Sequence, residues 1–323
     1  MRRLLLLSLP LALLGSCVDL DAFVYGGVHC SAVGPETCED PADWNSVCLP
    51  CETPYDWSRS YDWMEGTLEA GESIRPIDPS RVTAHRIPTA DGEGELDAYL
   101  IASHGDDPEL AGTTLLYHHG NYAGLEHYLP RIQMLHELGY TVFAWDYRGY
   151  GKSEPATHPT PLQFLADART VRAYVDGLVP DPDRIVLYGY SLGTIPTVEA
   201  GLADPGCAMM VEAPFTSVRQ IARSSSGLAL PPGFLSSGHF ENSKKIEGYD
   251  GPLLVMHGGD DRLFPPEDVR AFHDAAPGPK ELWTVEGADH GIDNGGVPED
   301  GLAEYGRRMR AFLTTHAPGC FGP

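Results

Sequence analysis

Residues 189–193 read Gly-Tyr-Ser-Leu-Gly, which places Ser191 between two glycines. A serine in such a string is a nucleophile when a strand precedes it and a helix follows it, because the sharp turn between them exposes the hydroxyl. Both conditions are predicted here, since Ile185–Tyr188 is typical of a buried strand and Leu192–Ala203 of a helix. We therefore predict that Ser191 is a catalytic nucleophile.

A serine hydroxyl needs a base to accept its proton, and that base is usually a histidine held by a carboxylate. In hydrolases with this elbow, the acid and then the histidine follow the serine along the chain. Asp261 follows the predicted strand Pro252–Met256, and His290 follows the predicted strand Glu281–Val285. Because the carboxyl ends of parallel strands share one edge of a sheet, we predict Asp261 as the acid and His290 as the base.

Two other carboxylates are alternatives for the acid. Asp260 is the immediate neighbour of Asp261, and Glu212 directly follows the preceding predicted strand, Ala208–Val211. Asp261 is favoured over both.

The attack of the serine places a negative charge on the carbonyl oxygen of the substrate, and two N–H donors must already be in place to stabilise it. One is expected from the backbone amide of Leu192, directly after the nucleophile. The other is expected from the turn after the predicted strand Thr113–Tyr117, where we favour the backbone N–H of Asn121, with Tyr122 as the alternative.

This chemistry needs no metal or organic cofactor, and none is expected. His118 and His119 lie in the same turn and could suggest a metal pair. Adjacent residues on an extended chain point to opposite faces, however. Structural roles in the turn are therefore expected for both histidines.

From about residue 80, apolar strands alternate with amphipathic helices, which predicts a mostly parallel central sheet with helices on both faces. The pattern opens with a hairpin, Val82–Pro88 and Glu95–Ala102. The other predicted elements are a strand at Thr141–Trp145 and helices at Leu125–Leu138, Pro161–Leu178, Pro266–Ala275 and Asp300–Thr315. Residues 215–249 interrupt the alternation with small, polar and turn-forming residues, so we predict a short lid insertion there.

The N-terminus is typical of an export signal. Leu4–Leu14 is too short to span a bilayer as a helix, and it follows Arg2 and Arg3. Leu14-Gly15-Ser16-Cys17 resembles a bacterial lipobox, which would make Cys17 a lipidated first residue and the protein's only link to a membrane. We expect residues 1–16 to be a signal peptide, and the mature protein to be anchored in the bacterial cell envelope or, alternatively, secreted.

Residues 17–75 form a Cys-rich segment with no sustained periodicity, ahead of a catalytic domain at 76–323. Its two Tyr-Asp-Trp triplets, at 55–57 and 61–63, are expected to pack aromatic rings on the main domain. In an exported chain, six cysteines besides Cys17 favour disulfides. Two bridges within residues 30–51 and one between Cys207 and Cys320 are expected, although the spacing of Cys48 and Cys51 leaves a zinc site as an alternative.

The chain carries 46 acidic and 22 basic residues, a net charge of −24, and removal of residues 1–16 would make it −26. Nucleic-acid binding depends on concentrated Lys and Arg. A nucleic-acid partner is therefore not expected.

Further motifs resemble the α/β-hydrolase-domain (ABHD) proteins and the serine-aminopeptidase-like hydrolases. They occur in the family's order over about residues 80–315, and comprise His119-Gly120-Asn121, residues 146–153, the elbow at 189–193, residues 212–217, residues 240–258, and the Asp261 and His290 motifs. The resemblance implies an α/β-hydrolase fold, supports Asp261 as the acid, makes Glu212 structural, and implies that Asp146 and Arg148 brace a loop. It does not cover residues 17–75, and Thr194 stands where many relatives have glycine.

The leading hypothesis is a carboxylesterase-like serine hydrolase that cleaves an acyl ester or thioester of a small molecule through an acyl-enzyme. A peptidase or amidase would use the same residues, with Glu241 or Glu247 as a possible anchor for a substrate amine. A non-catalytic envelope protein that uses this fold for binding is the third hypothesis.

Overall fold

The computed structural model describes residues 25–34, 38, 49–59, 73–218, 220, 239–291 and 301–321. The predicted signal peptide, Cys17, the triplet at 61–63 and most of the predicted lid lie outside these residues. Among the described residues, no helix is long and apolar enough to cross a membrane.

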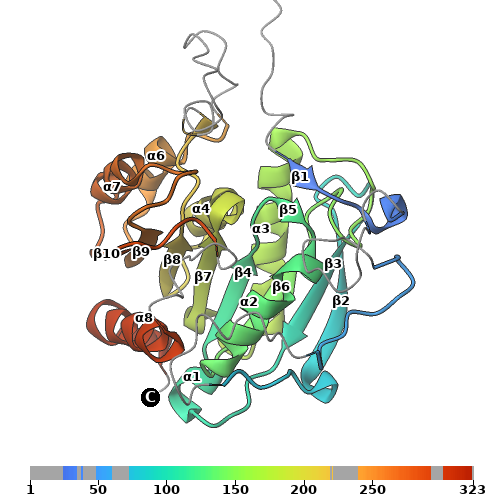
Figure 1. The fold of residues 1–323 in the computed structure, drawn as a ribbon, viewed down its shortest axis with the longest axis horizontal. Coiled ribbons are helices and arrows are strands. Elements are labelled where there is room, and N and C mark those ends of the chain that lie inside the picture. Colours follow the sequence, from blue (N-terminus) through green and yellow to red (C-terminus); the bar gives the residue numbers. More distant parts are fainter. Residues whose placement is uncertain are drawn as a thin grey trace, which may run out of the picture.

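The centre of the molecule is an eight-stranded sheet in the order β10-β9-β8-β7-β4-β6-β3-β2 (Figure 1). Its strands are β2 (Val82–Pro88), β3 (Glu95–Ile101), β4 (Thr114–His118), β6 (Thr141–Trp145), β7 (Ile185–Tyr190), β8 (Ala208–Glu212), β9 (Leu253–Gly258) and β10 (Lys280–Val285). Strand β3 runs antiparallel to β2 and β6, and all other neighbours are parallel. The four strands β4, β7, β8 and β9 are buried along their whole length, as the continuous apolar runs predict for a sheet covered on both faces.

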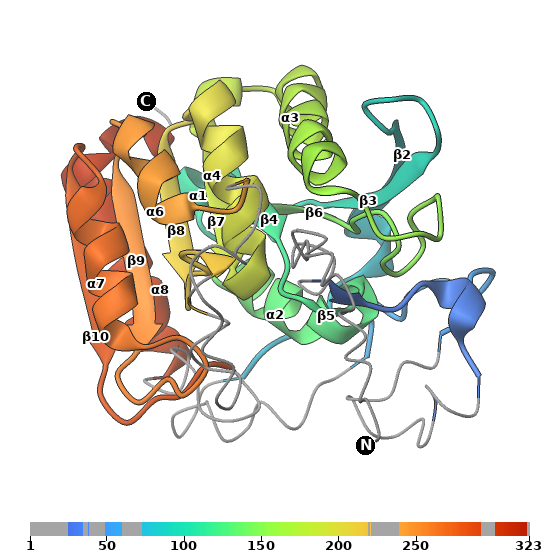
Figure 2. The same cartoon turned by 90° about the horizontal axis from the view of Figure 1, so that it is seen from above.

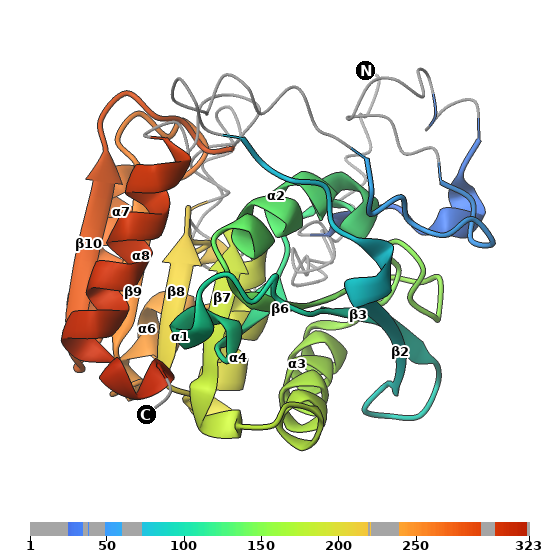
Figure 3. The ribbon, with the colours of Figure 1, turned by 90° about the horizontal axis from the view of Figure 1, so that it is seen from below.

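Helices cover both faces of this sheet, which confirms the predicted arrangement. The helices are α1 (Pro108–Ala111), α2 (Leu125–Glu137), α3 (Pro161–Leu178), α4 (Thr194–Ala203), α6 (Asn242–Lys245), α7 (Pro266–Ala275) and α8 (Leu302–His316). Helices α2 and α8 pack on one face (Figure 3), and α3, α4 and α7 pack on the other (Figure 2). Short 3₁₀ turns lie at Cys30–Ala32, Pro79–Arg81, Pro182–Arg184, Ser191–Gly193, Ile246–Gly248 and Pro318–Cys320.

The described part of the N-terminal segment lies against the main domain. Strand β1 (Gly26–Gly27) pairs in parallel with β5 (Tyr122–Ala123), a two-residue strand just after β4. Tyr55 and Trp57 are buried, with ring centroids 5.4 and 5.1 Å from that of Tyr99 on β3. The first Tyr-Asp-Trp triplet therefore packs on the sheet, as predicted.

One disulfide lies within the N-terminal segment, and another ties the C-terminal end of the described chain to the main domain. Cys30 pairs with Cys51, and Cys38 is also disulfide-bonded. A zinc site built on the Cys48–Cys51 spacing would need the Cys51 sulfur as a free thiolate, and its bond to Cys30 favours the disulfide. The predicted bridge between Cys207 and Cys320 is present, with 5.4 Å between the Cα atoms.

Candidate active site

The turn at Ser191 joins β7 to α4 with no room for larger residues at its two glycines. A Cβ on Gly189 would overlap the Thr197 hydroxyl, and a Cβ on Gly193 would overlap the carbonyl oxygen of His118. Ser191 itself has a φ of 53°, a left-handed conformation that is uncommon for a residue with a side chain. One 3₁₀ turn precedes the helix, so α4 begins at Thr194 and not at Leu192 as expected. This is the geometry of a nucleophile elbow.

The three side chains expected to do the chemistry meet above this turn. The Nε2 atom of His290 lies 3.0 Å from the Ser191 Oγ, and its Nδ1 lies 2.9 Å from Asp261 Oδ2. Ser191 and Asp261 are buried, with 6% and 5% of their surface exposed. Such a chain of contacts lets the histidine take the serine proton while the carboxylate fixes its other nitrogen.

The Asp261 carboxylate is held by its own loop. Its Oδ1 accepts hydrogen bonds from the backbone N–H groups of Leu263 and Phe264, at 2.8 and 2.7 Å. These bonds leave Oδ2 directed at His290. The buried His257 lies 3.6 Å from the same oxygen, and burial lowers the pKa of His257, which favours a neutral ring there.

Sequence reasoning missed two neighbours that position His290. Asp289 accepts hydrogen bonds from the backbone N–H of His290 at 2.8 Å and from that of Arg262 at 3.0 Å, and so joins the acid and histidine loops. The Phe264 ring lies edge-on to the His290 ring with 4.7 Å between centroids. The only signal for Asp289 was its position beside the predicted base.

The alternative acids lie elsewhere. Asp260 is exposed. Glu212 is fully buried, and its Oε2 accepts hydrogen bonds from Arg131 and from the hydroxyls of Tyr188 and Tyr305. That oxygen already has three donors, so Glu212 has a structural role, as the family resemblance implied.

The two amides expected to bind the oxyanion belong to segments that touch. Gly193 of the elbow packs on the backbone of His118 and His119, just before the loop that carries Asn121. Within the described loops, no hydrogen bond engages the N–H group of Asn121. The N–H of Tyr122, the alternative donor, is bonded to the Tyr128 hydroxyl at 3.1 Å, which favours Asn121.

The adjacent histidines of this loop have separate surroundings. His118 Nδ1 lies 2.8 Å from the Thr197 hydroxyl, and burial lowers the pKa of His118 to about 3. His119 stacks on Tyr147 with 4.0 Å between centroids, and its Nδ1 lies 2.8 Å from the Gly120 carbonyl oxygen. Each ring is engaged with its own neighbours, which agrees with the structural roles expected for both.

Asp146 and Arg148 brace the loop after β6, as the resemblance implied. Asp146 accepts hydrogen bonds from the Leu125 N–H at 2.7 Å and the Tyr55 hydroxyl at 2.9 Å. Arg148 is buried and pairs with Asp167 of α3.

Part of the predicted lid is attached to the body. Asn242 of α6 donates its side-chain amide to the Phe215 carbonyl at 2.8 Å, and Lys245 donates to Glu199 of α4 at 2.8 Å. Of the suggested amine anchors, Glu241 is partly buried and Glu247 is exposed.

Comparison with known proteins finds that the chain is similar to α/β-hydrolase proteins. A family model described as serine aminopeptidase, S33, matches residues 111–235. An uncharacterized protein of Mycobacterium tuberculosis is 31% identical over 181 residues, which are 56% of this chain and 63% of that protein, so the match spans less than two thirds of this relative. The alpha/beta hydrolase domain-containing protein 17C of Mus musculus is 27% identical over 207 residues, 64% of this chain and 61% of that protein.

A Pyrococcus furiosus esterase has a similar structure, with a TM-score of 0.58 and 21% identity over 82% of this chain and all of that one. This likeness shows a common fold, the one predicted from the sequence.

Proposed function

The chain belongs to the α/β-hydrolase superfamily, and from that membership we propose that it is a carboxylesterase-like serine hydrolase that cleaves acyl esters or thioesters of small molecules. One observation carries the proposal: His290 lies within hydrogen-bond distance of both Ser191 and Asp261, and Ser191 occupies the elbow. This arrangement supports nucleophilic catalysis by an activated serine.

In the proposed mechanism, His290 takes the proton of Ser191 as the Oγ attacks the acyl carbon. The Asp261 carboxylate stabilises the imidazolium that forms. The N–H groups of Asn121 and Leu192 stabilise the negative charge on the carbonyl oxygen. His290 then protonates the leaving alcohol or thiol, and the acyl group stays on Ser191. In the second half, His290 activates a water molecule that hydrolyses this acyl-enzyme.

Substitution Ser191→Ala tests the proposal. The nucleophile would be lost while the fold remains, so hydrolysis of short p-nitrophenyl esters should fall by about 10⁶-fold. Turnover by the purified variant is compared with that of the wild type, and thermal unfolding controls for folding. A variant that keeps most of the activity contradicts the assignment. A folded wild type that neither hydrolyses esters nor reacts with a fluorophosphonate probe favours the non-catalytic binding hypothesis.

Peptide or amide hydrolysis is the second candidate, because the matching family model is that of a serine aminopeptidase. The same three residues would act, and Glu241 or Glu247 would anchor the substrate amine. Rates on acyl esters and on aminoacyl amides, measured side by side, separate the two. A higher kcat/KM on the amides, lowered by Glu241→Gln or Glu247→Gln, would favour the peptidase.

We also propose that the protein is exported and anchored through a lipid on Cys17, or is secreted. The signal-like N-terminus and the disulfides support this, since disulfides persist outside the reducing cytosol. Mass spectrometry of the mature N-terminus tests it, with Cys17→Ser as the unlipidated control.

A further inference from the structure

We propose that residues 25–30, which we name the N-terminal strap, are a positioning element of the oxyanion hole. The strap holds the loop that carries Asn121, and it lies outside the part of the chain that the family model matches. This inference rests on the proposed function, because it assigns a role in the same site.

The Asn121 side chain is the direct link between the strap and the site. Its Oδ1 accepts two hydrogen bonds, one from the backbone N–H of Gly26 at 2.7 Å and one from the Tyr150 hydroxyl at 2.8 Å. Two donors on one oxygen fix the orientation of the side chain. The backbone N–H of the same residue, which would bind the oxyanion, is thereby fixed as well.

Backbone pairing extends this contact over the rest of the loop. Strand β1 runs along β5, and the N–H of Val28 donates to the Ala123 carbonyl at 3.2 Å. Two further bonds link the strap to Gly151, from the Gly151 N–H to the Val28 carbonyl and from the Cys30 N–H to the Gly151 carbonyl, at 2.9 and 2.7 Å. The strap therefore joins the loop at 121–123 to the loop after β6.

The conformation of the loop requires such support. Ala123 is buried and has a φ of 53°, in the left-handed region, where a residue with a Cβ carries a free-energy cost. A strained conformation persists only where its surroundings determine it. The pairing with β1 is a part of those surroundings that lies outside the catalytic domain.

The strap is itself fixed by aromatic packing. Tyr25 is buried, and its ring centroid lies 5.6 Å from that of Phe164 and 6.5 Å from that of Tyr150. Gly27 lies so close to the Tyr150 ring that a Cβ would overlap it. The Tyr150 ring therefore contacts the strap, while its hydroxyl holds Asn121.

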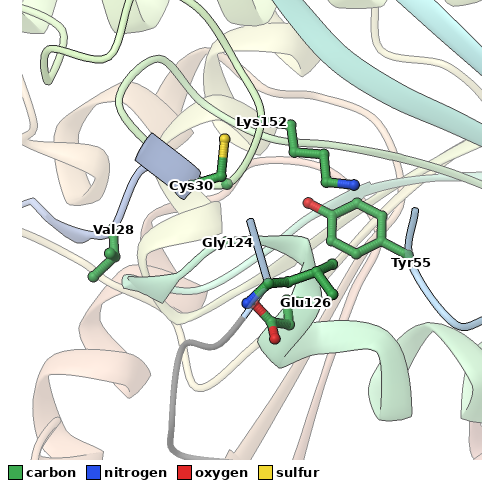
Figure 4. Close-up of a pocket in the computed structure, with 8 residues that line it drawn as sticks. Val28, Cys30, Tyr55, Gly124, Glu126 and Lys152 are labelled. Carbon is green, nitrogen blue, oxygen red and sulfur yellow. The ribbon is translucent and has the colours of Figure 1, made fainter. Parts of the chain in front are cut away.

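A second arm, residues 49–59, locks the strap through the Cys30–Cys51 disulfide. The Tyr55 hydroxyl of this arm donates to Asp146, and its Thr53 carbonyl accepts a hydrogen bond from Lys152. The Lys152 ammonium group lies over the Tyr55 ring, 4.2 Å from its centroid, at the small cavity between the two arms (Figure 4). Both arms thus end on the loops that flank the proposed oxyanion hole.

Substitution Gly27→Ala tests the inference. The added Cβ must push the strap off Tyr150, so the Asn121 amide should lose its position and kcat on a p-nitrophenyl ester should fall by about 10-fold or more, with KM unchanged. Gly34→Ala, outside the strap, is the matched control, because a Cβ there meets no atom of the described residues within 4 Å, and its kcat should equal that of the wild type.

Two further readouts separate positioning from general damage. Hydrogen–deuterium exchange of residues 119–124 should be faster in Gly27→Ala than in Gly34→Ala, while exchange in β7 and β9 is unchanged. In an Asn121→Ala background, Gly27→Ala should have a much smaller effect on kcat, because the side chain through which the strap acts is gone.

The possible failures are distinguishable. An active wild type with equal kcat and equal loop exchange in Gly27→Ala and Gly34→Ala overturns this inference and leaves the proposed function standing. An equal loss from Gly27→Ala with and without the Asn121 side chain also overturns it. A folded wild type that hydrolyses no ester and is not labelled by a fluorophosphonate overturns the proposed function, and the inference with it.

Discussion

Ser191 and Asn121 flank the same proposed reacting carbonyl, yet the molecule holds them by different means. Ser191 is fixed within five consecutive residues, by a left-handed backbone and two glycines that allow close packing. Asn121 is fixed from a distance, by Gly26 from 95 residues before it and Tyr150 from 29 residues after it. The nucleophile side is thus a local structure, and the oxyanion side is assembled from remote parts of the chain.

Because the two sides of the site are held by different means, mutations should impair each side without disrupting the other. A local turn forms with the sheet and helix that it connects. A loop held by remote hydrogen bonds loses its position when any one partner moves, even while the sheet is intact. Substitutions on the nucleophile side should therefore nearly abolish hydrolysis, and substitutions on the oxyanion side should lower kcat only partially.

After the loss of Ser191 itself, the largest effect on the nucleophile side is expected from Asp261→Asn. An amide at this position cannot stabilise the imidazolium and favours the wrong tautomer of His290, so kcat should fall by about 10⁴-fold. The neighbouring Asp260→Asn is the control, because Asp260 is exposed and the carboxylate that contacts His290 is that of Asp261. Steady-state kinetics on one ester measure both variants. Equal activities would show that another carboxylate is the acid.

The nucleophile side could be predicted from sequence because its determinants are consecutive or follow strand ends. The elbow lies between a predicted strand and helix, and Asp261 and His290 each follow a strand. Parallel pairing of β9 with β10 then brings the two residues together. The same reasoning predicted the buried sheet, because its continuous apolar strands are stable only when both faces are covered.

The support of the oxyanion side could not be predicted. Gly26 donates through its backbone, and no side-chain pattern marks a backbone donor or its partner. Strand β1 has two residues, too few for any periodicity. The start of α4 was misplaced for a similar reason, since the left-handed φ of Ser191 delays the helix by one 3₁₀ turn.

An intermediate effect is expected from Gly193→Ala, which disrupts the contact between the nucleophile side and the oxyanion side. The Cβ would overlap the His118 carbonyl, so the elbow and the oxyanion loop must move apart and kcat should fall by about 10²- to 10³-fold, as for the loss of one oxyanion donor. Gly177→Ala in α3 is the control, because its Cβ meets no atom within 4 Å in the part of the chain that the structure describes. Kinetics and thermal unfolding are measured for both. A native kcat in Gly193→Ala would show that the two sides need not touch.

The smallest effect is expected from Tyr150→Phe, which removes one of the two donors to the Asn121 Oδ1 and keeps the ring that contacts the strap. A single hydrogen bond contributes about 1 kcal/mol, so kcat should fall by about 3- to 10-fold with KM unchanged. Tyr174→Phe in α3 is the control, because that hydroxyl contacts His85. Steady-state kinetics on the same ester measure both variants.

The double variant Tyr150→Phe with Gly27→Ala tests whether the strap and Tyr150 both act through Asn121. If both act on the same oxygen of Asn121, their combined loss in kcat should differ from the product of the single losses, because contacting groups that share one partner are coupled. A strictly multiplicative loss would mean that the strap and Tyr150 act on the site independently. Asn121 would then not be the point at which the remote parts of the chain converge.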